Sequence, residues 1–201
     1  MKIQRDKVLV QIGTNQGNDD FNRICRRSRP SRVILVEPLA QLNPIIAKSY
    51  RRVKNVQVEN VAITDVDKGF VDLVIPRGRG YGLAHFSLLP MNDWGDDLER
   101  VRVPSMTFGQ LCEKHGIANI HYLQIDTEGF DAEIIKTIDF DRIAIDILKY
   151  EKWMFPIEAF TRHGEKARNY GVAGMAYVSE LLMSKGYKLT DVGSDIVATK
   201  I

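Results

Sequence analysis

The sequence predicts an α/β fold: a doubly wound, mostly parallel sheet of seven strands that ends in an antiparallel strand. Two observations indicate it. Runs rich in β-branched residues alternate with segments of helical periodicity, and only Gly193-Ser194-Asp195 joins the last two runs. Strand alternating with helix is typical of βαβ units with right-handed crossovers, and so short a connection requires antiparallel pairing.

Five strands are predicted in the parallel part of the sheet, at residues 8–12, 33–36, 56–58, 122–125 and 143–148. Each is a short apolar run, typical of a strand that is buried on both faces. Helical periodicity between them predicts helices at residues 18–27, 39–50, 107–115 and 131–138. A longer helix over residues 165–185, stopped by a glycine, precedes the last two strands at residues 187–192 and 196–199.

Two stretches, residues 69–104 and 152–174, interrupt this alternation. Long irregular segments within a compact domain are usually functional lids or disordered insertions, and both follow strands whose carboxyl ends would border a ligand crevice. They carry His85, His163 and the aromatic residues Tyr81, Trp94, Trp153, Phe155 and Tyr170.

The 201 residues are 44% hydrophobic and 27% charged, which excludes disordered, collagen-like and coiled-coil chains. The 28 Lys and Arg against 26 Asp and Glu give a net charge of +2, too balanced for a protein that mainly coats nucleic acid. Two distant cysteines, Cys25 and Cys112, indicate neither a disulfide framework nor a zinc site. No apolar run is long enough to span a membrane. We therefore expect a cytoplasmic protein.

The turn after the first strand is rich in glycine: Gly13, Thr14, Asn15 and Gln16 lead to Gly17. Glycine lets the backbone turn sharply and approach a ligand closely, and the amides at the start of the next helix can donate to a carboxylate. The spacing is neither the GxGxxG of dinucleotide-binding folds nor a P-loop. By itself the turn is either a tight strand–helix connection or part of a ligand site.

Glu37 and Pro38 end the second strand, 20 residues beyond the last glycine of that turn. A carboxylate at this strand tip can accept hydrogen bonds from both hydroxyls of a ribose; alone it would be a solvated strand end. Asn60, Ala62 and Ile63 follow the third strand, where apolar surface and an amide would flank an adenine. The combination favours a nucleoside ligand.

Acidic residues gather where the fourth and fifth strands end. Asp126 stands at the tip of the fourth strand, and Glu128 and Asp131 follow in a turn that opens a helix. Helix capping explains acids at a helix start but does not explain Asp126. Lys149 and Glu151 share one face of the fifth strand, and form either an exposed charge couple or part of the same crevice.

The glycine turn, the Glu-Pro strand end and the acidic strand ends, in this order, resemble the sequence pattern of the FkbM family of methyltransferases. Its members are S-adenosylmethionine-dependent enzymes of the class I, Rossmann-like fold. The resemblance spans nearly the whole chain and rests on VLVQIGTNQGND, VILVEP, NVQVENVAITD, MTFGQLCEKHGI, YLQIDTEGFDAEIIKTI and KYE. It implies S-adenosylmethionine as cofactor, S-adenosylhomocysteine as product and a hydroxyl group as methyl acceptor.

The resemblance also implies roles for single residues. The methionine end of the cofactor would contact Gly13, Thr14, Asn15 and Gly17, the ribose Glu37 and Pro38, and the adenine Asn60, Ala62 and Ile63, while Asp126, Glu128 and Glu151 would line the reaction centre. Three positions depart from the family pattern: Gln11 replaces an acid, Gln124 a lysine and Asp131 a glutamate. Gln11 can still orient the turn through its amide, whereas any role of the lysine does not transfer.

Methyl transfer to an alcohol requires alignment of the reacting atoms and removal of the hydroxyl proton. We expect Asp126 or Glu128 to act as the base or to orient the hydroxyl, with Glu151 in support and His85 or His163 as alternatives. Asp126, Glu128 and Glu151 are also oxygen donors suited to Mg²⁺ or Ca²⁺. This metal alternative is not favoured, because the family resemblance uses these residues without a metal.

A sugar, a glycan or another small hydroxylated metabolite is the expected acceptor, because the aromatic residues of the irregular segments can stack on a pyranose. An RNA (2'-O) methyltransferase is the alternative, suggested by the arginines at 23–32 and 51–52 and by the segment RGRGYG, although a charge run is usually a solvated helix face. A degenerate cofactor-binding domain is the third hypothesis, suggested by Gln11 and Gln124. A nicotinamide-dependent reductase comes last, because of the glycine spacing.

Residues 1–201 are expected to form one S-adenosylmethionine-binding methyltransferase domain. The first strand begins at Val8 and the last ends close to Ile201, so little chain is left for the N-terminal cap that class I enzymes often carry. We therefore expect either a domain cut from a longer polypeptide, with fused neighbours, or an enzyme that completes its site as a homo-oligomer.

Overall fold

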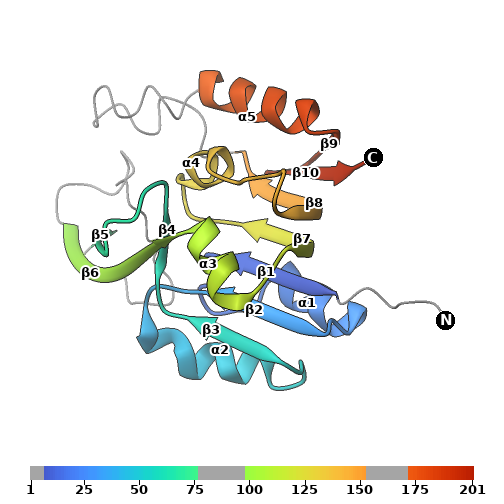
Figure 1. The fold of residues 1–201 in the computed structure, drawn as a ribbon. Helices are drawn as coiled ribbons and strands as arrows, with labels where there is room; N and C mark the ends of the chain where they lie inside the picture. The colour runs from blue at the N-terminus through green and yellow to red at the C-terminus, as the bar shows by residue number, and fades with distance from the viewer. Residues whose placement is uncertain (1–6, 77–97, 153–171) are drawn as a thin grey trace.

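The main sheet of the protein has seven strands in the order β3-β2-β1-β7-β8-β10-β9. The computed structural model in Figure 1 describes residues 7–76, 98–152 and 172–201. The strands of this sheet are β1 (Val8–Ile12), β2 (Arg32–Val36), β3 (Val56–Glu59), β7 (Asn119–Ile125), β8 (Ala144–Glu151), β9 (Tyr187–Val192) and β10 (Asp195–Lys200). β10 is antiparallel to both of its neighbours and the other pairings are parallel. The predicted fold is confirmed, and all seven predicted strands are present.

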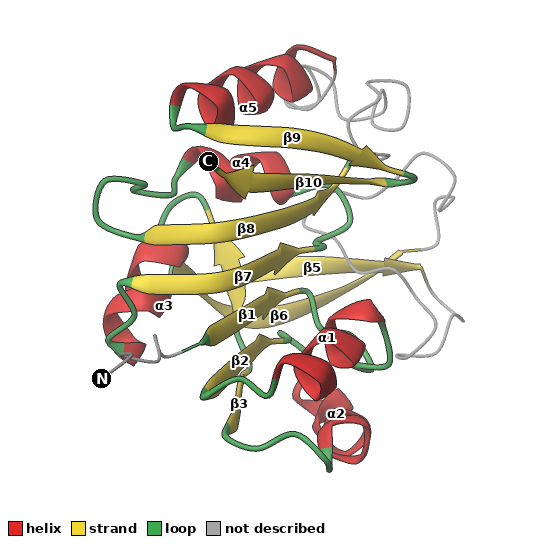
Figure 2. Cartoon of the chain, turned by 90° about the vertical axis from the view of Figure 1, so that its right-hand side faces the viewer, coloured by secondary structure: helices red, strands yellow, loops and turns green. Residues whose placement is uncertain are grey.

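Helices cover both faces of this sheet, as Figure 2 shows. On one face lie α1 (Asp20–Ser28) and α2 (Asn43–Tyr50), the latter preceded by a 3-10 turn, Ala40–Leu42. On the other lie α3 (Phe108–His115), α4 (Asp131–Lys136) and α5 (Val172–Ser184). Each face encloses an apolar core, because the strands carry Val, Ile and Leu on both sides. Residues 165–171 of the predicted last helix lie outside the described residues.

A second sheet, in the order β4-β6-β5, stands beside the first. It consists of β4 (Ala62–Thr64), β5 (Phe70–Pro76) and β6 (Leu98–Thr107). The prediction that residues 69–104 are irregular is therefore wrong for 70–76 and 98–104, while 77–97 lie outside the described residues. In β6 the exposed Arg102 is followed by the buried Val103, and the alternation continues to residue 105, whereas in β5 the exposed Asp72 precedes a run of three buried residues, 73–75. Alternation is typical of a strand covered on one face, and the charged residues interrupt the continuous apolar runs on which the strand predictions rested.

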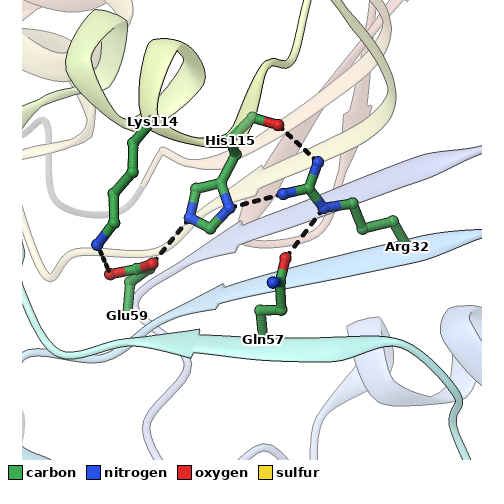
Figure 3. A network of polar contacts seen from close by, with 5 residues as sticks. All are labelled: Arg32, Gln57, Glu59, Lys114 and His115. Atoms are coloured by element: carbon green, nitrogen blue, oxygen red, sulfur yellow. Dashed lines mark hydrogen bonds and ion pairs between the residues drawn. The ribbon is translucent and has the colours of Figure 1, made fainter.

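A partly buried polar network ties the carboxyl end of α3 to β2 and β3 (Figure 3). The Arg32 guanidinium donates to the His115 carbonyl oxygen at 2.6 Å and lies 2.7 Å from His115 Nδ1. His115 Nε2 lies 2.8 Å from a Glu59 oxygen, and Lys114 Nζ lies 2.6 Å from the other. Because guanidinium can only donate, Nδ1 is the acceptor in this contact. The His115 side chain is 6% exposed.

None of the helices in the described part of the chain has the length and apolar composition needed to cross a membrane. Cys25 and Cys112 are both buried free thiols, and burial raises the pKa of each to about 12.

Candidate active site

A pocket opens at the carboxyl ends of β1, β2 and β7, the edge at which open α/β sheets bind ligands. Eight of the predicted site residues line it: Gly13, Asn15, Glu37, Pro38, Ala62, Ile63, Asp126 and Glu128. The remaining lining residues are Ile12, Val36, Val61, Leu73, Thr127 and Phe130. One end is therefore apolar, formed largely by β2, β4 and β5, and the other end is acidic.

The first turn requires glycine at two places. Gly13 has φ +85°, and a Cβ there would stand 1.7 Å from the carbonyl oxygen of Asp126. Gly17 has φ +65°, and a Cβ there would stand 2.6 Å from the ring of Tyr50. The first glycine thus lets the turn after β1 touch the acidic turn after β7. Asp19, rather than a ligand, accepts from the Asn22 amide at the start of α1.

Two buried oxygens of this turn are without a hydrogen-bond partner among the described residues: Thr14 Oγ1 and Asn15 Oδ1. A buried polar atom without a partner costs about 1–3 kcal/mol, so such atoms favour a site that a polar ligand completes. Thr14 is 2% exposed, and Asn15 lies on the pocket wall. Both were predicted to contact the methionine end of the cofactor.

Glu37 is held in a fixed orientation at the tip of β2. Its Oε2 accepts from the Asn15 amide at 2.7 Å, and its Oε1 accepts from the Leu39 amide at 3.0 Å. The side chain is 3% exposed; burial raises the carboxyl pKa, and the two amides oppose the rise. Each carboxylate oxygen keeps acceptor capacity, so Glu37 can bind a diol on its pocket side.

Asn60 supports the pocket from behind. Its Nδ2 donates to the Glu37 carbonyl oxygen at 2.8 Å, and its amide exchanges hydrogen bonds of 2.9 and 3.0 Å with Asn43. Among the described residues, the ones that line the pocket on the predicted adenine side are Val61, Ala62 and Ile63. Asn60 is thus placed to fix the turn at Glu37 and Pro38, a contact that strand spacing alone did not indicate.

Four further carboxylates surround Asp126. Burial raises its pKa from the usual 3.8 to about 8, and the charges of Asp131, Glu128, Glu151 and Asp19 add to the rise in that order. The sequence predicted that Asp126, Glu128 and Glu151 lie together, and the structure brings them together. A carboxyl whose pKa lies near neutrality can accept a proton efficiently at neutral pH, and perturbed groups in pockets are candidates for catalysis.

Asp131 connects the two acidic strand ends, which sequence reasoning missed. It is 1% exposed. Its Oδ1 accepts from the Thr127 amide at 2.9 Å and from the Thr127 hydroxyl, and its Oδ2 accepts from the Glu151 amide at 3.1 Å. Between them, Glu128 has φ +55°, a left-handed conformation that costs a non-glycine residue roughly 1 kcal/mol. Asp131 therefore holds a strained turn in place.

The two glutamines that depart from the family pattern are neighbours. Gln11 on β1 pairs in register with Gln124 on β7, and both are buried. Gln11 donates to Asp19 and accepts from the Tyr50 hydroxyl at 3.3 Å, so it does orient the start of α1 through its amide. The family pattern has an acid at the position of Gln11 and a lysine at the position of Gln124. The two glutamines therefore remove one negative and one positive charge, and the net charge of the protein is unchanged.

Several predicted residues are not part of this arrangement. His85, His163 and the aromatic residues at 81, 94, 153, 155 and 170 lie outside the described residues. Lys149 forms an ion pair with Asp195 at 2.8 Å. Within residues 7–76, 98–152 and 172–201, no group of three or more His, Cys, Asp or Glu side chains is arranged to hold a metal ion, so the metal alternative gains no support.

The missed lining residues had weak sequence signals. Leu73 belongs to the alternating strand β5, which was not predicted. Thr127 and Phe130 belong to the acidic turn, in which the charged residues carry the stronger sequence signal.

The strand order, the antiparallel β10 and the pocket at the carboxyl edge define a class I methyltransferase fold. A buried carboxylate for a ribose, an apolar wall for a base and partnerless oxygens in the glycine turn fit S-adenosylmethionine. Residues 11–189 match the family described as Methyltransferase FkbM domain. The chain belongs to this family, and it is an S-adenosylmethionine-dependent methyltransferase.

Solved structures agree in fold. An O-methyltransferase from Bacillus cereus, in complex with SAH, is 12% identical with a TM-score of 0.51, over 96% of this chain and 74% of that one. An rRNA methylase from Streptococcus thermophilus is 9% identical with a TM-score of 0.50, over 98% and 88%. At these identities the likeness concerns the fold alone. A search of curated proteins finds no match.

Proposed function

We propose that the protein transfers the methyl group of S-adenosylmethionine to a hydroxyl group on a sugar, a glycan or another small metabolite. The observation that carries this proposal is Asp126, a pocket carboxyl whose pKa is raised to about 8. An alcohol is a poor nucleophile until its proton is removed, and a base with a pKa near the working pH does this best. Asp126 is assigned as that base, and Glu128 and Glu151 as residues that orient the hydroxyl.

The acidic end of the pocket favours an acceptor without phosphates near the reacting hydroxyl. Burial is the largest cause of the raised pKa of Asp126, and the nearby charges of Asp131, Glu128 and Glu151 add to it. A nucleotide brings phosphates to within a few ångströms of its 2'-hydroxyl, and carboxylates at that distance would repel them. This supports a sugar or small metabolite over RNA, whose support remains the arginines at 23–32 and 51–52.

The deciding experiment measures formation of S-adenosylhomocysteine together with a mass gain in the acceptor, across sugars, glycolipids and RNA. We expect turnover on a phosphate-free hydroxylated acceptor, and its loss in Asp126→Asn. Asp146→Asn is the matched control, because this acid is 51% exposed and lies in the first half of β8. Methylation of RNA alone would favour the second candidate. Binding of S-adenosylhomocysteine without turnover on any acceptor would favour a degenerate domain.

Two further expectations belong with this function. A cytoplasmic location fits the two buried free cysteines. Sedimentation equilibrium, combined with activity at each concentration, tests whether the site is completed by a homo-oligomer; a fully active monomer on a free acceptor contradicts both oligomerisation and dependence on a fused neighbour.

A further inference from the structure

Positive charge is concentrated in one part of the chain. The segment Asp20–Lys54 contains nine of the 28 Lys and Arg residues but two of the 26 Asp and Glu residues. One of these two acids, Glu37, is buried in the pocket. Although the whole protein is near neutral, this segment therefore carries a strong local positive charge.

Eight of the nine cations form what we call the α1–α2 basic surface. All eight are exposed: Arg23, Arg26, Arg27, Arg29, Lys48, Arg51, Arg52 and Lys54. Within the described residues, Arg23 alone of them is in an ion pair, with Asp20 at 3.0 Å. The ninth, Arg32, is bound to His115 and does not belong to the surface.

The C-terminal end of α2 lies against α1. Arg26 Nη2 and Asn22 Nδ2 both donate to the Ser49 carbonyl oxygen, at 2.9 and 3.2 Å, so the exposed cations at residues 48, 51 and 52 lie near those of α1 in the chain's fold. Figures 1 and 2 show α1 and α2 side by side on one face of the sheet. Mutual repulsion among these cations destabilises the fold, and a polyanionic partner would relieve it.

Apolar side chains accompany these cations. Ile45 on α2 is 42% exposed, and Pro44 and Ala47 beside it are exposed as well. Exposed aliphatic side chains next to Lys and Arg on a helix are the composition of a surface that lies in the interface of a bilayer. Clusters of four to eight basic residues of this kind bind anionic lipid headgroups.

We propose that the α1–α2 basic surface docks on an anionic phospholipid bilayer. Single-stranded nucleic acid is usually held by exposed aromatic rings in addition to cations, but the aromatic residues of these helices, Phe21 and Tyr50, are buried at 0% and 3% exposure. The surface also adjoins the candidate site: Ser49 Oγ donates to the Gln16 carbonyl oxygen at 2.9 Å, in the glycine turn. Docking would therefore bring the pocket close to the bilayer. The proposal does not depend on the identity of the acceptor.

The test is sedimentation of the purified chain with vesicles of phosphatidylcholine, with and without phosphatidylglycerol. We expect binding to the anionic vesicles alone, weakened by added salt. Each basic residue near an anionic surface changes the partition coefficient about fivefold, so Lys48→Gln/Arg51→Gln/Arg52→Gln should lower it by roughly a hundredfold. The matched control, Lys68→Gln/Arg100→Gln/Lys188→Gln, removes three exposed charges elsewhere and should bind like the natural sequence.

Two further arms separate lipid from other polyanions. Ile45→Ser removes no charge, and should weaken vesicle binding while leaving retention of single-stranded RNA unchanged. Circular dichroism melting of every variant confirms that it is folded. Equal binding to neutral vesicles, equal loss in the two triple variants, or binding of RNA but not of anionic vesicles would each overturn the proposal.

Discussion

The pH dependence of methyl transfer provides the sharpest test of Asp126. If its carboxylate is the base, the ionised fraction at pH 7 is about one tenth, because the pKa of Asp126 is raised to about 8. The ratio kcat/KM for the cofactor, which reports groups of the free enzyme, should rise about tenfold per pH unit up to that value and then level off. Asp126→Asn should lower kcat by roughly 10²- to 10⁴-fold and remove this rise.

A second substitution separates the base from its surroundings. Asp131→Asn removes the largest charge contribution to the raised pKa of Asp126 and retains one oxygen to accept from Thr127. The rise of kcat/KM with pH should therefore occur at lower pH in this variant, whereas a purely structural defect would lower activity equally at all pH values. Asp146→Asn is again the control and should leave the profile unchanged. If kcat/KM of Asp131→Asn still rises up to about pH 8, the assignment of Asp126 as the base is refuted.

The same group predicts a change in stability with a definite sign. The folded state raises the pKa of Asp126, so it favours the protonated form, and the stability this contributes is present below about pH 4 and is lost as the pH rises through about 8. Asp126→Asn mimics the protonated form. It should match the natural sequence in thermal unfolding at pH 4 and exceed it at pH 9, by up to about 5 kcal/mol. If the difference in stability between Asp126→Asn and the natural sequence is the same at pH 4 and pH 9, the Asp126 carboxyl is not desolvated.

Four other substitutions or treatments have defined outcomes. Glu37→Gln should weaken binding of S-adenosylhomocysteine by about 10- to 100-fold in calorimetry, because hydrogen bonds to a charged group are lost; unchanged affinity would remove the ribose role. Gly13→Ala should fail to fold or unfold at much lower denaturant concentration, since its Cβ would overlap the Asp126 carbonyl oxygen; a midpoint near that of the natural sequence contradicts the geometry. Gln11→Asp and Gln124→Lys should each destabilise the fold by leaving a buried charge, and the double variant should recover at least about 1 kcal/mol of the summed loss in urea unfolding; additive losses would show that the two sites do not interact. Activity should survive exhaustive EDTA treatment, and its loss and restoration by Mg²⁺ would revive the metal alternative.

The main sheet was predictable because its strands are buried on both faces. Continuous apolar runs such as residues 8–12 and 33–36 are typical of strands buried on both faces. The helices between these runs indicate crossover connections, which make neighbouring strands parallel. The second sheet was not predictable by the same criterion, because Asp72 in β5 and Arg102 in β6 interrupt the apolar residues of these strands. Of these two strands, β6 alone alternates in burial, at residues 102–105.

The candidate site was partly predictable for a related reason. Residues at strand tips, such as Glu37 and Asp126, can be assigned from strand ends alone, since the carboxyl edge of a parallel sheet collects them. The partners of Asp131 and Asn60 could not be assigned. Their hydrogen bonds join segments 20 and 23 residues apart, and which side chain meets which backbone amide depends on the packed turn rather than on local pattern.

The features that reduce stability coincide with the proposed chemistry. Asp126 sits among four other carboxylates, Glu128 adopts a left-handed conformation, and Asp131 is a fully buried acid. Each costs free energy of folding, and such violations of local rules are expected at functional sites. Gln11 and Gln124, which stand where the family pattern has an acid and a lysine, do not have such a cost. They avoid two buried charges, and Gln11 keeps a hydrogen bond to Asp19. A domain that had lost its function would be expected to relax the costly acidic cluster first. Here the cluster is intact and the supporting layer beneath it has become neutral, which argues for an active enzyme rather than a degenerate one.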